Sequence, residues 1–336
     1  MGTTRQDPQK VTPLPCARHE FGCLGRSSLA RNAFFPRSAP QRPATRARRH
    51  VYCEILELLA RPTRRTLDPF LTAKKNPRVN LIAPKTDILP PAQRLLWPAL
   101  RILEHGFVLY GGTAVALRYG HRQSIDFDFF AAQAFDPDIL KAKYEFLKKG
   151  ETIQLGLNTL SLLVPTPYGE VKFSFFGGLT FGRVGHPAIC VDNLVRVASP
   201  LDLAIQKLKV IRVRSEAKDY LDLDCLLRNG VDLAEALGGA QTLYPGFPIP
   251  VTLRAMCYFD DGDVGSIPNE AKKRLMAETR QFNAPAKVPL RDDHLDLSPS
   301  EIKRVEKKHL QLKKTENEEK SGKKPKRKTR PNASSS

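Results

Sequence analysis

One short stretch constrains this chain more than any other: residues 109–130, which read LYGGTAVALRYGHRQSIDFDFF. It predicts an apolar strand from Phe107 to Tyr110, a break at two glycines, and a helix for which Thr113 is a natural N-cap and Gly120 a natural end. A second strand follows from Ile125 to Phe130. A strand, a turn, a helix and another strand in direct succession indicate a compact α/β unit.

The second of these strands carries two acidic side chains. Asp126 and Asp128 are two residues apart, so both carboxylates leave the same face of the strand. Ile125, Phe127 and Phe129 alternate with them, and we expect these three to face the core. Two neighbouring acids repel one another unless a positive charge compensates them. Hard oxygen ligands suit Mg²⁺ or Mn²⁺, so we expect Asp126 and Asp128 to bind a divalent cation.

The glycines at the turn supply a second chemical feature. Gly111 and Gly112 lack a Cβ atom, so a ligand can approach the backbone closely. The N–H groups at the start of the following helix, including that of Thr113, attract an anion such as phosphate. A phosphate cradle beside a metal site is the arrangement needed for phosphoryl or nucleotidyl transfer, because cations neutralise the triphosphate there.

These residues also carry a family resemblance. Gly111-Gly112-Thr113, followed after twelve residues by Asp126-Phe127-Asp128, resembles the signature of the polymerase-β-type nucleotidyltransferases. The full sequence of residues 109–130 is more specific than this signature. It resembles the AbiEii/AbiGii toxin family, nucleotidyltransferase-like toxins of bacterial toxin–antitoxin and abortive-infection systems. The resemblance implies an α/β (α+β) nucleotidyltransferase fold, a mixed sheet flanked by helices, that uses a nucleoside triphosphate.

A second cluster extends the resemblance. Residues 207–222, KLKVIRVRSEAKDYLD, are similar to the second motif of the family, with Val210 where that pattern has a smaller residue. The resemblance implies that Lys207 and Arg214 bind the phosphates, as their charges and hydrogen-bond donors permit. Asp219 is then expected to orient these cations or to act as a base toward the attacking hydroxyl. A surface salt-bridge network along one helix is the alternative interpretation, which the glycine and acid motif disfavours.

The turn before the acidic strand leaves alternatives open. The resemblance makes His121 and Arg122 part of a Gly-His-Arg turn. Arg122 is expected to pair with Asp128 or with a phosphate, and His121 to order the turn by hydrogen bonding.

Many enzymes of the parent superfamily carry a third acid on a neighbouring strand. Residues 171–176 of this chain read VKFSFF, so the corresponding position holds Ser174 or Lys172. Of the nearby residues, Glu170 at the strand edge could replace the acid. This departure argues against a mechanism with three carboxylates.

The formal charge of +19 is unevenly distributed. Residues 1–78 have 16 Lys or Arg against 5 Asp or Glu, residues 301–336 have 13 against 5, and residues 79–300 have 25 of each. We expect disordered basic ends, with a capped helix from Pro299 to Lys314, because such compositions bury too little apolar surface. Residues 1–78 have two other interpretations, a transit peptide or a true start of translation near Val79 or Asn80.

The remaining patterns predict a sequence of helices and strands between these ends. Helices are expected at residues 90–105 with a kink at Pro98, at 137–149, at a segment capped by Ser199, and in a small helical region between 231 and 281. Strands are expected at residues 159–164, 171–176 and 188–192, the first two forming a hairpin. Cys190, Cys225 and Cys257 are expected to be buried thiols, which favours a reducing cytoplasm.

Four segments follow from these patterns. Residues 1–78 form a basic extension, 79–195 the nucleotidyltransferase core, 196–297 a helical region that completes the site, and 298–336 a basic helix and tail. The expected function is Mg²⁺-dependent transfer of a nucleotidyl group to an acceptor hydroxyl, with RNA such as tRNA as the acceptor and an antitoxin as a possible partner. The alternative is a catalytically reduced relative that binds nucleotide or RNA. No membrane partner is expected, since no apolar run approaches about 20 residues.

Overall fold

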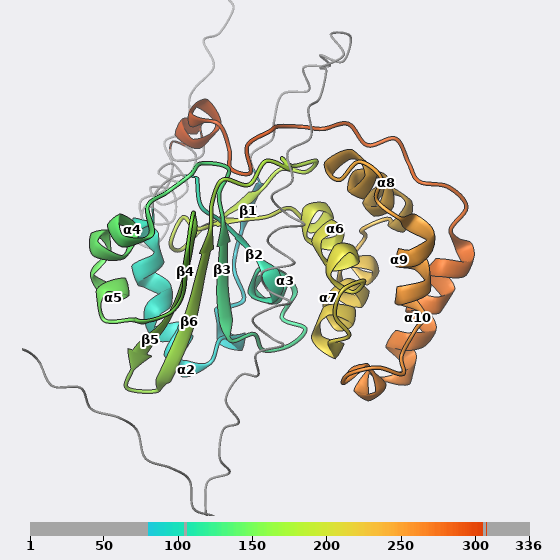
Figure 1. The fold of residues 1–336 in the computed structure, drawn as a ribbon, viewed down its shortest axis with the longest axis horizontal. Helices are drawn as coiled ribbons and strands as arrows, with labels where there is room; N and C mark the ends of the chain where they lie inside the picture. The colour runs from blue at the N-terminus through green and yellow to red at the C-terminus, as the bar shows by residue number, and fades with distance from the viewer. Residues whose placement is uncertain (1–79, 104–105, 305–306, 308–336) are drawn as a thin grey trace, which may run out of the picture. The chain divides into compact units, whose positions relative to one another are not determined.

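The computed structural model describes residues 80–103, 106–304 and 307, all of which belong to one compact unit. The basic extension at residues 1–78, the basic tail and the far half of the helix expected at 299–314 lie outside the described residues. In the described part, eight strands form one mixed sheet in the order β1-β7-β8-β2-β3-β6-β5-β4 (Figure 1). The strands are β1 (Asn80–Ile82), β2 (Val108–Tyr110), β3 (Asp126–Phe130), β4 (Glu151–Gly156), β5 (Thr159–Thr166), β6 (Gly169–Phe176), β7 (Ala188–Cys190) and β8 (Arg196–Val197).

The helices lie between and beyond these strands. The first part of the described chain contains η1 (Thr86–Ile88), α2 (Pro91–Leu96), η2 (Trp97–Ile102), α3 (Gly111–Tyr119), α4 (Pro137–Lys143) and α5 (Glu145–Lys148). The second part contains α6 (Pro200–Val210), α7 (Ala217–Arg228), α8 (Leu233–Leu243), α9 (Ile249–Met256), η3 (Val264–Ser266) and α10 (Asn269–Gln281). The expected α/β class, a mixed sheet flanked by helices, is confirmed. Within the described ranges, every helix is too short or too polar to span a bilayer.

The two faces of the sheet differ in chemistry. On one face, aromatic rings from adjacent strands stack, with Phe127 5.1 Å from Phe173 and Phe129 5.3 Å from Phe175 between ring centroids. Trp97 extends this layer 6.1 Å from Phe127, on the side that α2 and α5 cover. Helix α3 packs on the other face, against β2 and β3, and α6 and α7 pack on α3 (Figure 1). The acidic face of β3 therefore looks toward α3, α6 and α7 rather than into the aromatic layer.

The structure corrects two expectations about the strand, turn, helix and strand at residues 107–130. Helix α3 begins at Gly111 with Tyr110 as its N-cap, so Thr113 lies in the first turn and is not the cap. Ile125 precedes β3 and is 66% exposed, because the strand begins at Asp126 and the alternation starts only there. The expected end of the helix is confirmed, since Gly120 adopts the left-handed conformation with φ +67°.

Two expected helices are interrupted. The pattern at residues 90–105 divides into α2 and the 3₁₀ helix η2, whose second residue is Pro98, so the expected kink is confirmed. The single helix expected at 137–149 is wrong. Tyr144 has an extended backbone and a buried ring, and it separates α4 from α5.

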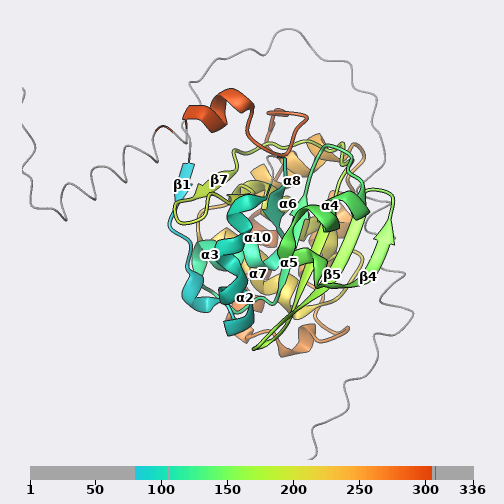
Figure 2. The same cartoon turned by 90° about the vertical axis from the view of Figure 1, so that its left-hand side faces the viewer.

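Three strands were absent from the expectations. β1 and β8 are short, and β4 is mostly exposed and contains a register shift between Thr152 and Gln154, so each gives a weak alternating pattern. The expected hairpin of β5 and β6 is confirmed, with antiparallel register from Thr159 opposite Phe176 to Thr166 opposite Gly169. Figure 2 shows β1 and β7 at one end of the sheet and β4 at the other.

The later expectations agree more closely with the structure. Ser199 caps α6 by accepting a hydrogen bond from the Asp202 amide at 3.0 Å. Cys190 and Cys225 are buried, whereas Cys257 is half-buried, so the expectation for Cys257 is wrong.

The expected boundary between residues 195 and 196 stays a prediction. Strand β8, which follows it directly, pairs with both β2 and β7.

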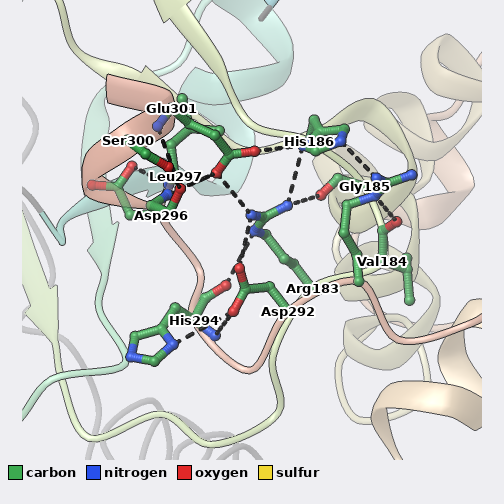
Figure 3. Close-up of polar contacts among 12 residues, drawn as sticks. Arg183, Val184, Gly185, His186, Asp292, His294, Asp296, Leu297, Ser300 and Glu301 are labelled. Atoms are coloured by element: carbon green, nitrogen blue, oxygen red, sulfur yellow. Dashed lines mark hydrogen bonds and ion pairs between the residues drawn. The ribbon is translucent and has the colours of Figure 1, made fainter. Parts of the chain in front are cut away.

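A buried arginine ties the segment after α10 back to the sheet. The Arg183 guanidinium is 1% exposed and donates hydrogen bonds to the carbonyls of Gly185 at 3.0 Å and His294 at 3.1 Å (Figure 3). It also donates to the Asp292 carboxylate at 3.2 Å and lies 3.8 Å from that of Glu301. One side chain thus holds four acceptors from segments more than one hundred residues apart.

The capping box expected at the next helix is confirmed. The Glu301 carboxylate accepts a hydrogen bond from the Ser298 amide at 2.8 Å, and Ser298 Oγ accepts one from the Glu301 amide at 3.4 Å. Residues 299–304 are helical, and Ile302 packs with Ile189 and Leu297 beside β1 and β7.

We predict that Arg183→Ala lowers the free energy of unfolding by about 2 kcal/mol, because it removes a buried guanidinium that donates to the Asp292 carboxylate and to the carbonyls of Gly185 and His294. Urea denaturation of the full chain measures this. The control is Arg254→Ala on α9, an exposed arginine, which should change stability by less than about 0.5 kcal/mol. Equal losses of stability in the two variants would contradict a stabilising role for the Arg183 contacts.

Candidate active site

The glycine turn lies against both the acidic strand and the Gly-His-Arg turn. Gly111 has φ +71°, and a Cβ atom there would lie 2.5 Å from Asp128 Oδ2. A Cβ atom on Gly112 would collide with Arg122 Nη2. Both positions therefore require glycine, for conformation at Gly111 and for close approach at both. The first amides of α3 lack acceptors within the helix, as a phosphate cradle requires.

Thr113 links the glycine turn to β3 through its side chain. Its Oγ1 contacts the backbone carbonyl of Asp126 and lies 2.9 Å from Ser124 Oγ. Because the hydroxyl is buried and occupied in this way, a phosphate bound here would meet the Thr113 amide rather than its side chain.

Asp126 and Asp128 project from the same face of β3, as the alternation predicted. Phe127 and Phe129 are buried on the opposite face. Asp128 Oδ1 is buried and has no hydrogen-bond partner among the described residues. Burial raises the pKa of Asp128, and the nearby Asp126 carboxylate raises it further. An orphaned carboxylate oxygen beside a second acid fits a hard divalent cation, which would satisfy the oxygen and remove the repulsion.

Strand β6 lies next to the acids and runs parallel to β3. The register places Lys172 beside Asp126 and Ser174 beside Asp128. Ser174 is fully buried, and its Oγ has no hydrogen-bond partner in the described part of the chain. Glu170 is exposed near the start of β6. Strand β6 therefore places a lysine and a serine beside the acid pair, at the position where many enzymes of the superfamily carry a third acid.

Asp222 on α7 is the centre of a buried polar cluster. Its carboxylate accepts hydrogen bonds from Arg122 Nε at 2.6 Å and Arg122 Nη2 at 2.7 Å, and it contacts His121 Nε2 at 2.7 Å. The Lys207 ammonium lies 2.6 Å from Asp222 Oδ2, the oxygen that also accepts from Arg122 Nη2. Arg122 therefore pairs with Asp222 and not with Asp128, and His121 orders the turn by the expected hydrogen bonding.

Asp219 holds the other two expected cations. It accepts hydrogen bonds from Lys207 Nζ at 2.7 Å and Arg214 Nε at 2.8 Å, and its side chain is fully buried. Both oxygens are occupied by cations. This arrangement favours an orienting role for Asp219 over the role of a base, because a base must reach the hydroxyl whose proton it takes.

The charges in this cluster are mutually compensated. Burial alone would raise the pKa of Asp222, but Lys207, His121 and Arg122 hold it well below its usual range. Lys207 and Arg214 likewise lower the pKa of Asp219 against the effect of burial. Burial disfavours the charged form of Lys207, yet the two aspartates raise its pKa. Lys207, Asp219 and Asp222 are therefore charged at neutral pH.

The two clusters predicted from the sequence meet at one site. The positive charges of Lys207 on α6 and of Arg214, between α6 and α7, lower the pKa of Asp128, so this part of the helical region faces the acid pair. Arg122 connects the clusters directly, since it abuts Gly112 and pairs with Asp222. Among the described residues, no group of three or more His, Cys, Asp or Glu side chains is placed to hold a metal ion.

Two site residues were underestimated from the sequence. Asp222, the last residue of the second motif, was assigned no role from the sequence, whereas it contacts three basic side chains. Lys172 was noted only as a non-acidic residue, although it is the register partner of Asp126. The shared alternation of β3 and β6 could have indicated Lys172, but their register could not be read from either strand alone.

Comparison with known proteins identifies the family. A family model described as "Nucleotidyl transferase AbiEii toxin, Type IV TA system" matches residues 94–296, which include both clusters. The chain belongs to the AbiEii family. The resemblance stated from residues 109–130 and 207–222 is thereby confirmed, and the chain is a nucleotidyltransferase of a toxin–antitoxin family.

Individual relatives of this AbiEii chain carry little functional description. It is 32% identical over 158 residues to "Uncharacterized protein aq_aa25" of Aquifex aeolicus (strain VF5), which covers 46% of this chain and 74% of the Aquifex protein. It is also similar to a crystal structure described as a "putative nucleotidyltransferase from H. pylori", with 18% identity and a TM-score of 0.39. That similarity covers 56% of this chain and 90% of the H. pylori chain.

We predict that Asp222→Asn lowers the rate of nucleotidyl transfer by about 10²-fold, because Lys207 and Arg122 lose the carboxylate that fixes them. The matched control is Asp224→Asn, two residues along α7. Asp224 is also buried and ion-paired, at 2.7 Å from Arg274 Nε, but faces α10. This control should lose stability while keeping its transfer rate, and equal loss of rate in both variants would contradict the assignment.

Proposed function

We propose that this AbiEii protein transfers a nucleotidyl group from a nucleoside triphosphate to an acceptor hydroxyl on RNA, such as tRNA, with Mg²⁺ or Mn²⁺ as cofactor. One observation supports this most directly: the acid pair, with its orphaned Asp128 oxygen, lies beside the glycine turn and faces a fixed lysine. The alternative of a solvated salt-bridge network is disfavoured because Lys207, Asp219 and Asp222 are buried.

Each group of residues at the site has a separate role in the proposed reaction. Asp126 and Asp128 would hold the cation, which supplies positive charge to the phosphate oxygens when bound. The amides of Gly111, Gly112 and Thr113 donate hydrogen bonds to phosphate. The acceptor hydroxyl oxygen forms a bond to the α-phosphorus and gives up its proton to water, the bond from that phosphorus to the bridging oxygen of the β-phosphate breaks, and pyrophosphate leaves.

The cationic side chains bind the departing phosphates. Lys207 presents an ammonium whose position is fixed by Asp219 and Asp222, so little conformational entropy is lost when it meets a phosphate. Arg214 is fixed by Asp219, and Arg122 by Asp222. Each cation is thus already held in place before the substrate arrives, as electrostatic catalysis requires.

The acceptor and the biological role extend this proposal. RNA is favoured because residues 1–78 and 301–336 hold the whole positive excess of the chain, and phosphate backbones attract such segments. The type IV toxin–antitoxin description of the family supports a toxin that acts in a bacterial cytoplasm and is countered by an antitoxin. Ser174 supports the second candidate, a relative that binds nucleotide with reduced catalysis.

We predict that the full chain, incubated with Mg²⁺, total bacterial RNA and each α-³²P-labelled nucleoside triphosphate in turn, labels an RNA band. Asp126→Ala should reduce this labelling by about 10²–10³-fold, since it removes half of the cation site. Asp138→Ala, which alters an exposed acid on α4, serves as the control and should label normally. Triphosphate binding without a labelled product would favour the second candidate.

We also predict that Asp128→Asn raises the free energy of unfolding of the metal-free protein by about 1 kcal/mol, because it removes a buried charge that is repelled by Asp126. The same variant should lose the Mg²⁺-induced rise in melting temperature that the wild type shows. Differential scanning calorimetry with and without Mg²⁺ measures both effects. A wild type that Mg²⁺ does not stabilise would refute the cation site.

A further inference from the structure

Strand β6 presents two unusual neighbours to the acid pair. Because β3 and β6 are parallel and in register, Lys172 and Ser174 leave the sheet on the same face as Asp126 and Asp128. The residues nearest the carboxylates on this strand are therefore a cation and a neutral hydroxyl. A second divalent cation at this point would have to lie close to the Lys172 ammonium.

The two register partners Asp128 and Ser174 share a second property. Asp128 Oδ1 and Ser174 Oγ are both buried, and neither has a hydrogen-bond partner among the described residues. A hydroxyl can donate to a carboxylate oxygen, and such a donor fixes the orientation of a carboxylate that binds a metal. In this structure the two atoms are not hydrogen-bonded to each other, so both are available when a cation binds to the acid pair; unsatisfied buried polar atoms are rare in folded proteins and point to a ligand.

The negative charge available for cations is limited. Asp219 and Asp222 are the other buried acids near the site, and both are already paired with Lys207 and with an arginine. Two carboxylates, Asp126 and Asp128, are left to oppose a cation. Their charge of −2 balances one divalent ion, whereas two ions would leave a charge of +2 that no nearby acid of the described residues compensates.

We propose that the site binds a single divalent cation, that the Ser174 hydroxyl orients Asp128 toward it, and that the Lys172 ammonium occupies the place of a second cation. This inference rests on the proposed function, since it assumes that Asp126 and Asp128 bind the first ion. Lys172 then supplies a permanent positive charge to the substrate phosphates, and Ser174 is a positioning residue.

The first test counts ions. Titration of the full chain with Mn²⁺, followed by electron paramagnetic resonance, gives the number of bound ions, and Asp126→Asn gives the background from the rest of the chain. We expect one Mn²⁺ per chain that depends on Asp126. Two such ions would overturn the inference and leave the proposed function intact. No Asp126-dependent ion would refute the metal site of the proposed function itself.

The second test isolates Ser174. Ser174→Ala should weaken Mn²⁺ binding about 10-fold, as loss of a group that orients a metal ligand does. The metal-free fold should keep its stability, because the substitution removes a buried hydroxyl that has no partner. The matched control is Ser161→Ala on β5, whose buried serine is the register partner of Ser174 one strand farther from the acids. Equal Mn²⁺ affinity in both variants would overturn the role of Ser174.

A third substitution adds the acid that the strand lacks. Ser174→Asp should allow a second Asp126-dependent Mn²⁺ ion, whereas Ser161→Asp, which introduces the same charge at a position of equal burial, should not. If Ser174→Asp fails to fold, the count for the wild type and the comparison of the two alanine variants still decide the inference.

Discussion

The site depends on one buried carboxylate. Asp222 contacts His121, Arg122 and Lys207 at 2.6–2.7 Å, and these side chains come from the turn before β3 and from α6. Removing such charges from water costs several kcal/mol per ion, and the cost is offset only when the hydrogen bonds are short and complete. The three contacts to Asp222 meet this condition, so the cluster has one arrangement and positions the glycine turn relative to α6 and α7.

The fixed cluster contrasts with the acid pair beside it. Asp128 has an orphaned oxygen and a raised pKa, whereas Asp219 and Asp222 are satisfied and have lowered pKa values. The protein therefore pairs the charges that position the site and leaves an unsatisfied oxygen on the acid that we propose binds a cation. Such local instability is common at functional sites, because groups that bind a ligand are unsatisfied without it.

The sequence indicated which residues could form the candidate site, but not which of them pair with one another. Alternation placed Asp126 and Asp128 on one face, and the glycine pair and Lys207 followed from local spacing and family resemblance. The pairing of Arg122 with Asp222 joins residues one hundred positions apart, so no local pattern indicates it. Thr113 was misplaced because Tyr110 begins the helix, and the strands β1, β4 and β8 were missed because their pairing, not their propensity, defines them.

The central claim is that Lys207, fixed by Asp219 and Asp222, receives the triphosphate. Isothermal titration of the full chain with α,β-methylene analogues of the four nucleoside triphosphates, in the presence of Mg²⁺, tests it most directly. Lys207→Met should weaken the tightest-bound analogue by about 10-fold or more, since a charged hydrogen bond is lost. Lys209→Met, on the same helix but 3.7 Å above the Tyr244 ring, should leave the affinity unchanged. Unchanged affinity in Lys207→Met would contradict the account.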